Sequence, residues 1–324
     1  MQRMTVMFAI VAVSLGAICA GPAAAQAYPT RPIRIIVPAA PGGNIDLLTR
    51  AVTGRLGDYL GQPFVVENRP GATTSIAEEY VVKSPPDGYT LLMSGMTLAT
   101  QPFVRANLHY DPLRDLAMIS LIATSGNVIV VNSSVPAKSV AELIALGKAS
   151  AKPMHYGTPV FGAAAHLAAE MFNQMACVKF VQVPYKGGAP ALQGVLSEQI
   201  EMTFANIPEA ISLIRSGRVR ALAVTSTKRD RQLPDVPTVA EAGLPGYEIV
   251  AWFGMVGPAK LPEAIVNRIS AEAVKTLKEP VVMERLDRIG FDLIGTTPAE
   301  FRAYVKSEID KLGQVIRAAG IKAE

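Results

Sequence analysis

IRIIVPAAPGGNIDLLTR, residues 33–50, is the stretch that decides the fold. Its apolar run ends at Pro38, the chain then turns at Pro41-Gly42-Gly43, and Asn44 carries a side chain typical of a helix N-cap. Beyond this point apolar residues recur at helical spacing, and they are Ile45, Leu48, Val52, Leu56, Tyr59 and Leu60. The stretch therefore predicts a strand, a glycine turn and a helix.

The start of the predicted helix is suited to bind an anion. Its first backbone N–H groups have no partner within the helix, and Gly42 and Gly43 let a ligand approach the main chain closely. The alternative is a tight connection between strand and helix that binds nothing. Asp46 lies in the first turn, where a carboxylate complements the helix dipole but repels an anion. Asp46 therefore either stabilises the helix or accepts a hydrogen bond from a bridging water or a ligand N–H.

The first 27 residues have the pattern of a secretory signal. Arg3 precedes a long uncharged and mostly apolar run, and Ala25-Gln26-Ala27 offers a cleavage site before Tyr28. The alternative is a retained membrane anchor, but the apolar run is short and small residues follow it. We therefore expect a free periplasmic protein.

Composition and motifs argue against several classes of function. Removal of Arg3 with the signal lowers the formal net charge from +4 to +3, and the basic residues are spread evenly, so nucleic acid is not expected as a partner. The sequence has no dinucleotide, nucleoside triphosphate or nucleophile-elbow motif. His109, His155 and His166 form no metal-binding pair, and Cys177 has no second thiol beside it in the mature chain. We expect no cofactor, no metal and no catalytic group.

Strands, turns and helices alternate along the rest of the chain, which indicates a soluble α/β protein with two domains. Ser125-Gly126-Asn127 precedes a β-rich run and suggests a crossing between the domains, and the polar stretch after Thr225 suggests the return. The C-terminal helices then pack on the first domain, and a capped helix is expected to start at Thr297. Residues 28–122 and 225–324 are expected to form one domain and residues 123–224 the other, with a hinge that can close.

Ordered motifs cover essentially the whole mature chain. They are YPTRPI at 28–33, PGG at 41–43 with Asp46 and Arg50, GQP at 61–63, VENRPGA at 66–72, PDGYTLL at 86–92, VPYKGGAPA at 183–191, RALAVT at 220–225, LPDVPTV at 233–239 and AGLPGYE at 242–248. Together they resemble one family, the extracytoplasmic solute receptors of tripartite tricarboxylate transporters, also called the Bug family. So many motifs in order make the resemblance specific.

The resemblance implies a type II periplasmic-binding-protein fold, with two α/β domains, two crossover strands and a ligand cleft between the domains. The family binds carboxylates through backbone groups and ordered waters at loops that begin helices. By position, the first domain would contribute Pro41, Gly42, Gly43, Asp46, Ala72, Thr73, Thr74, Ser94 and Met96. The second domain would contribute Thr158, Phe161, Gly162, Ala163, His166, Lys186, Gly187, Gly188 and Asn206.

Some of these positions depart from the family pattern. The family usually has two glycines where Thr73 and Thr74 stand, and a glycine and a serine where Val160 and Ala163 stand. Because bulk is added beside the expected ligand, the preferred carboxylate is expected to differ from the commoner ligands of the family. Phe161 and Phe253 either line an apolar part of the pocket, which would suit an aromatic or longer aliphatic acid, or belong to the core.

Single residues keep two interpretations. His166 follows a glycine loop early in a helix, and it is either a ligand or hinge contact or a capping or core residue. Lys186 is an obvious countercharge for a carboxylate, but Lys186-Gly187-Gly188 can also act through its N–H groups alone. Thr73 and Thr74 are also candidates for N-cap residues.

The expected function is the capture of a small di- or tricarboxylate, or of an aromatic acid, by a periplasmic monomer. A ligand that bridges the two domains would favour closure through its higher affinity for the closed state. By resemblance, the closed receptor would dock on the membrane permease subunits of a tripartite transporter. Two alternatives remain, which are a sensing subunit that serves a sensor protein and an enzyme that acts on a carboxylate in the same cleft.

Overall fold

The computed structural model describes residues 28–321, and the predicted signal at 1–27 lies outside them. The strands are β1 (Ile33–Val37), β2 (Phe64–Asn68), β3 (Thr90–Gly95), β4 (Leu116–Val131), β5 (His155–Thr158), β6 (Val181–Pro184), β7 (Met202–Asn206), β8 (Arg220–Val224), β9 (Val250–Pro258) and β10 (Asp292–Leu293). The helices are α2 (Asn44–Leu60), η1 (a 3-10 turn, Ala72–Thr74), α3 (Ser75–Val82), α4 (Thr97–Val104), α5 (Pro112–Asp115), α6 (Val140–Ala149), α7 (Ala164–Ala176), α8 (Gly188–Leu196), α9 (Ile207–Arg215), α10 (Glu263–Leu277), α11 (Pro280–Asp287) and α12 (Pro298–Ala318).

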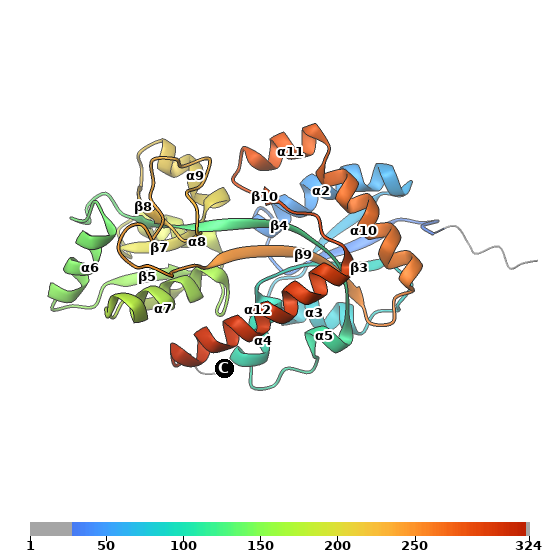
Figure 1. Ribbon diagram of the computed structural model, residues 1–324, viewed down its shortest axis with the longest axis horizontal. Helices are drawn as coiled ribbons and strands as arrows, with labels where there is room; N and C mark the ends of the chain where they lie inside the picture. Colours follow the sequence, from blue (N-terminus) through green and yellow to red (C-terminus); the bar gives the residue numbers. More distant parts are fainter. Residues whose placement is uncertain (1–27, 322–324) are drawn as a thin grey trace, which may run out of the picture.

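The strands form one continuous sheet in the order β2-β1-β3-β9-β4-β7-β5-β6, and β8 and β10 pair with β4 beside this path. β1 runs parallel to β2 and β3, and β5 runs parallel to β6 and β7. The antiparallel strands β9 and β4 lie between these two parallel groups, as Figure 1 shows. We call the β1–β3 group, with β9, β10, α2–α5 and α10–α12, the first half. The β5–β8 group, with α6–α9, is the second half.

β4 is a single strand of 16 residues that joins the two halves. Residues 116–126 pair with β9, and residues 127–131 pair with β7 and β8. The crossing between domains that the sequence suggests at Ser125-Gly126-Asn127 lies inside this strand, where the pairing partner changes from β9 to β7 and β8. Distant partners bond two polar groups of this segment, since Ser125 donates to the carbonyl of Gly290 and the N–H of Asn127 donates to the hydroxyl of Thr225.

The opening unit has the predicted strand, turn and helix. Ile33, Ile35, Ile36 and Val37 are fully buried, as expected for a parallel strand with helices on both faces. One detail of the prediction was wrong, because the N-cap of α2 is Gly43 and Asn44 is the first helical residue.

The C-terminal helix α12 begins as predicted. Thr297 and Glu300 form a complete capping box around its first turn. α12 then packs against α4 and β4, and its far end contacts α7 of the second half. The short helix α4 was not anticipated from the sequence. Within residues 28–321, no helix has the length and apolar character needed to cross a membrane.

Candidate functional site

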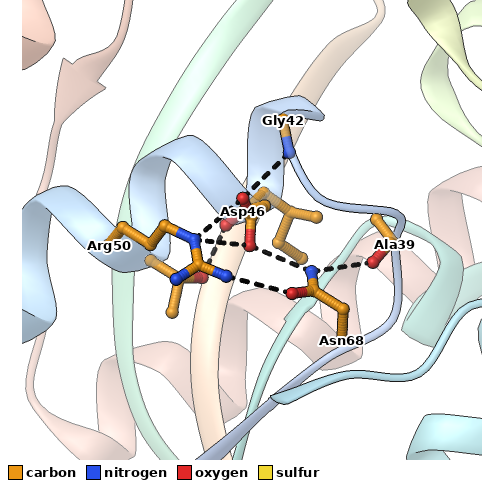
Figure 2. Close-up of polar contacts among 7 residues, drawn as sticks. Ala39, Gly42, Asp46, Arg50 and Asn68 are labelled. Carbon is orange, nitrogen blue, oxygen red and sulfur yellow. Dashed lines mark hydrogen bonds and ion pairs between the residues drawn. The ribbon is translucent and has the colours of Figure 1, made fainter. Parts of the chain in front are cut away.

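Asp46 organises the glycine turn that precedes α2. Figure 2 shows its carboxylate accepting hydrogen bonds from the Gly42 N–H (2.9 Å), from Nε of Arg50 (3.0 Å) and from Nδ2 of Asn68 (2.9 Å). Asn68 also donates to the carbonyl of Ala39, at the other side of the turn. The turn is therefore held from both sides by side chains of α2 and β2.

The surroundings of Asp46 keep it charged. Burial alone would raise its pKa, but the hydrogen bonds from Arg50, the Gly42 N–H and Asn68 outweigh burial, and the pKa is lowered. Its side chain is only 3% exposed. Of the two roles considered for Asp46, the structure shows the stabilising one. The Gly42 N–H donates to Asp46 and the Gly43 N–H donates to the carbonyl of Ala40, so the first main-chain donor left for another group is that of Asn44.

The next donor, the N–H of Asn44, is met by a carboxyl group from the second half. The carboxyl of Glu209 in α9 faces this N–H, which partly offsets the rise that burial causes in the pKa of Glu209. An ideal Cβ built on Gly188 would lie 1.7 Å from Oε2 of Glu209, so the same carboxyl lies directly against the start of α8. Glu209 thus joins the two glycine turns that the sequence predicted as anion sites.

Glu209 was missed by the sequence analysis. With Asn206 as N-cap and Glu209 three residues later, the sequence fits a capping box, which would give the glutamate a purely local role. The structure shows no side-chain hydrogen bond at that cap. The signal available in the sequence was a glutamate in the first turn of a predicted helix, close to the predicted site residue Asn206.

The second glycine turn, Lys186-Gly187-Gly188, begins α8. Gly187 has φ of 132°, a conformation that favours glycine, and α8 starts without a side-chain cap. The Lys186 side chain is exposed. The main chain of Gly188, rather than the lysine ammonium, therefore lies against the Glu209 carboxyl.

The loop before α3 has an unusual backbone. Ala72, Thr73 and Thr74 have φ of 45°, 53° and 78°, all in the left-handed region, which costs an L-residue about 1–2 kcal/mol. Two of these three positions, Thr73 and Thr74, are those at which the resemblance implies glycines. Gln101 donates to the carbonyl of Thr73 and Arg105 donates to that of Ala72, so α4 holds the strained loop in place.

The threonine hydroxyl of this loop faces a buried acid. Thr74 and Ser94 both donate to Oε1 of Glu78, at 3.0 and 3.2 Å, and Tyr110 donates to Oε2. Thr74 is the N-cap of α3, but its hydroxyl makes no capping hydrogen bond to the main chain. Burial raises the pKa of Glu78 to about 7, although the three hydroxyls favour its charged form. The Ser94 hydroxyl is fully buried in this cluster.

The loop before α7 contacts the first half. The hydroxyl of Thr100 in α4 donates to the carbonyl of Gly162 at 2.9 Å. The Gly162 N–H donates to Nδ1 of His166 at 3.1 Å, and Phe161 packs on the imidazole with ring centroids 4.6 Å apart. His166 therefore closes its own loop as a neutral ring. Burial lowers the pKa of His166 to about 4, in agreement with that role.

Substitution of His166 by asparagine, which keeps an acceptor but cannot gain a proton, tests this role. Between about pH 6.5 and 4 the unfolded state binds a proton at His166 that the native state does not bind. His166 therefore lowers the unfolding free energy as the pH falls. The unfolding free energy of wild type relative to His166→Asn should fall by about 2 kcal/mol from pH 7 to pH 5. Urea unfolding at both pH values measures it. The unfolding free energy of the variant is subtracted from that of wild type, because buried Glu78 changes the stability of both proteins with pH in the opposite direction. A constant difference would show that His166 is not held neutral.

The remaining predicted residues are placed as follows. Met96 and Thr158 are buried, and the hydroxyl of Thr158 accepts a hydrogen bond from Gln182 at 2.7 Å. Pro41 is exposed, and Ala163 is the half-buried N-cap of α7. Oδ1 of Asn206 is buried without a partner. Their roles in ligand binding stay predictions.

Two surface hollows lie away from these residues. A hollow of about 620 Å³ lies between α2 and β2 and is lined by residues that include Gly54 and Phe64. A smaller hollow of about 340 Å³ is lined by α7 and the end of α12. None of the predicted ligand-binding residues lines either one. Within residues 28–321, no group of three or more His, Cys, Asp or Glu side chains could hold a metal ion.

This chain is similar to known proteins in both sequence and fold. A model of the tripartite tricarboxylate transporter family receptor matches residues 48–321. Protein BugT of Bordetella pertussis is 34% identical over 324 residues, 99% of each chain. The structure of R. palustris Rpa4515 with adipate superposes with a TM-score of 0.88, at 35% identity, covering 92% of this chain and 100% of that one.

A second solved structure, MatC from Rhodopseudomonas palustris with bound malate, has a TM-score of 0.83 at 29% identity and covers 89% of this chain and 100% of its own. The expected type II fold and the resemblance that implied it are thereby confirmed. The chain belongs to the family of tripartite tricarboxylate transporter receptors.

Proposed function

We propose that this chain is a periplasmic receptor that captures a small carboxylate between its two halves. One observation carries the proposal, namely that the carboxyl of Glu209 lies against the start of α8 and faces the start of α2, two uncapped helix starts from opposite halves. Gly43 and Gly187 precede these helices and supply no capping side chain. The N–H of Asn44 already faces a carboxyl group, that of Glu209. Main-chain donors at helix starts are well suited to hold a carboxylate.

The solved relatives support the same class of ligand. Two of them were solved with adipate and with malate, which are both dicarboxylates. The α7 loop adds a third uncapped helix start on the second half.

We further propose that the receptor passes its ligand to permease subunits in the membrane and is not an enzyme. The family membership and the secretory signal predicted from the sequence support this location and partner. The alternative, a sensing subunit, would bind the same ligand at the same site. The domain boundaries near residues 122 and 224 belong to this proposal, and the change of β4 partners at residues 126–127 supports the first of them.

A ligand screen tests the proposed function. Purified protein is mixed with mono-, di- and tricarboxylates, both aliphatic and aromatic, and thermal unfolding is followed. Binding of at least one acid should raise the midpoint in a concentration-dependent way. The acid should be recovered unchanged after long incubation. A screen in which no carboxylate raises the midpoint contradicts the function, and consumption of the acid contradicts the claim that the chain is no enzyme.

A further inference from the structure

Glu78 in α3 carries a carboxyl group that is completely buried. Within residues 28–321, none of the ion pairs includes it. Its hydrogen bonds come from hydroxyl groups, since Thr74 and Ser94 donate to Oε1 and Tyr110 donates to Oε2. A carboxyl group that is removed from water is normally neutralised by a cation or by a proton. Because hydroxyl groups supply hydrogen bonds but no charge, Glu78 is placed to gain and lose a proton.

The charged groups around Glu78 do not hold it in its ionised form. Burial raises its pKa to about 7, and the hydroxyl groups and the charge of Arg105, at the end of α4, offset this rise only in part. The strands β3 and β9 pack against α3 and contain no charged residue, and Arg34 of β1 pairs with Glu67 instead. Burial also raises the pKa of Tyr110, so its hydroxyl stays a donor.

The Glu78 cluster lies beside the contact between the two halves. Thr74 accepts a hydrogen bond from Nε2 of Gln101 in α4 at 3.1 Å, and the same amide donates to the carbonyl of Thr73. The preceding residue of α4, Thr100, donates to the carbonyl of Gly162 in the second half at 2.9 Å. Thr74 therefore links Glu78 to the loop before α3, which is part of the predicted ligand site, next to a point where the halves meet.

The cluster is one hydrogen short when Glu78 is ionised. A carboxylate only accepts hydrogen bonds, so Thr74 uses its one hydroxyl hydrogen on Glu78. Oε1 of Gln101, on the amide that donates to Thr74, is buried without a partner. Buried polar atoms are nearly always hydrogen-bonded. A proton added to Glu78 would let the acid donate to Thr74, and the hydrogen that Thr74 then releases becomes available to another acceptor.

We propose that the receptor takes up one proton at Glu78 when it binds its carboxylate, so that its affinity falls as the pH rises. The inference rests on the proposed function, because it concerns regulation of the same site. A bound anion beside the loop before α3 makes a second buried negative charge more costly, which favours the protonated acid. By linkage, protonation then favours the anion by the same factor. The proton comes from the solvent and is held on one carboxyl oxygen of Glu78.

Calorimetry at pH 6 and pH 8 tests the proposal. The probes are adipate, malate and benzoate, whose carboxyl groups stay ionised over this range, joined by the acid with the largest midpoint shift in the ligand screen. Because Glu78 of the free receptor titrates near pH 7, wild type should bind about tenfold more weakly at pH 8 than at pH 6. Titrations at pH 8 in phosphate and in Tris, which differ in their heat of ionisation, should show uptake of about one proton per bound acid.

Glu78→Gln is the variant that isolates this carboxyl group. Its amide can donate to a hydroxyl of the cluster and accept from Tyr110, as the protonated acid does, so its affinity should be the same at both pH values. A purely structural role for Glu78 would instead weaken binding equally at both pH values. Glu79→Gln is the matched control, because Glu79 is the neighbouring residue of α3 and pairs with Lys83. It should keep the tenfold change.

Glu209 is a second carboxyl group whose pKa burial raises to about 7, and it is present in both wild type and Glu78→Gln. If Glu78→Gln folds, as its thermal transition shows, and still takes up the proton, the proton belongs elsewhere and the inference is overturned. If Glu78→Gln does not fold, Glu209→Gln decides the question, because proton uptake should persist in it and its loss would overturn the inference.

The wild-type measurements separate the inference from the proposed function. Binding with equal affinity at pH 6 and pH 8 and without proton uptake would overturn the inference and leave the proposed function standing. If none of the probes and no other carboxylate of the screen binds, the proposed function itself fails, and the inference fails with it.

Discussion

Gly43→Leu is expected to abolish carboxylate binding while the protein stays folded. Gly43 has φ of −74°, which any residue adopts, and an ideal Cβ there meets nothing closer than the carbonyl of Ala40 at 3.5 Å. The side chain therefore fits, but beyond Cβ it crowds the free donors at the start of α2. Loss of one or two charge-assisted hydrogen bonds should weaken binding by about 100-fold or more. Calorimetry with the acid found in the screen measures this.

Gly54→Leu is the matched control for this variant. Gly54 lies in the same helix, and an ideal Cβ there meets nothing within 4 Å, so leucine is tolerated and favours helix. Gly54 also lines the hollow between α2 and β2. Unchanged affinity in Gly43→Leu together with lost affinity in Gly54→Leu would place the ligand in that hollow and contradict the account.

Asp46→Ala is expected to lower the unfolding free energy by about 2–4 kcal/mol and to weaken ligand binding at the same time. The substitution leaves Nε of Arg50, Nδ2 of Asn68 and the Gly42 N–H without their shared acceptor. Because these groups hold the glycine turn, the donors at the start of α2 lose their fixed position. Urea unfolding and calorimetry measure the two effects.

The effect of Asp46 should also depend on pH. Its pKa is lower in the folded state, so its stabilisation is complete above the pKa of the unfolded carboxyl and is lost as the pH falls through the folded value. Wild type and Asp46→Ala should therefore converge in stability below about pH 4. Asp58→Ala, which removes an exposed pair with Arg55 on the same helix, should cost less than about 1 kcal/mol. Equal costs for the two variants would refute the organising role of Asp46.

Much of the fold follows from local sequence. The buried run Ile33–Val37, the glycine turn and the apolar face of α2 specify the first unit, and the Thr297 capping box specifies the start of α12. The continuity of β4 does not follow from local sequence. Its Ser125 and Asn127 resemble turn residues, and they enter a strand because Gly290 and Thr225, distant in sequence, supply their hydrogen bonds.

The site was also predictable only in part, because contacts between residues close in sequence can be predicted and contacts between distant residues cannot. Asp46 and His166 contact groups four residues away, so their local roles could be considered from sequence. The contact between Glu209 and Asn44 joins positions in opposite halves, and no local pattern announces it. The left-handed backbone at Thr73 and Thr74 was also hidden, because it depends on Gln101 and Arg105 of a helix that was not anticipated.

The central claim is that main-chain donors at helix starts from both halves hold the ligand. A crystal structure of the wild-type protein with its tightest-binding carboxylate tests it most directly. The account predicts carboxylate oxygens about 3 Å from main-chain N–H groups at the starts of α2, α7 or α8, with contacts from both halves. A ligand in the hollow between α2 and β2, or one held by a single half, would contradict it.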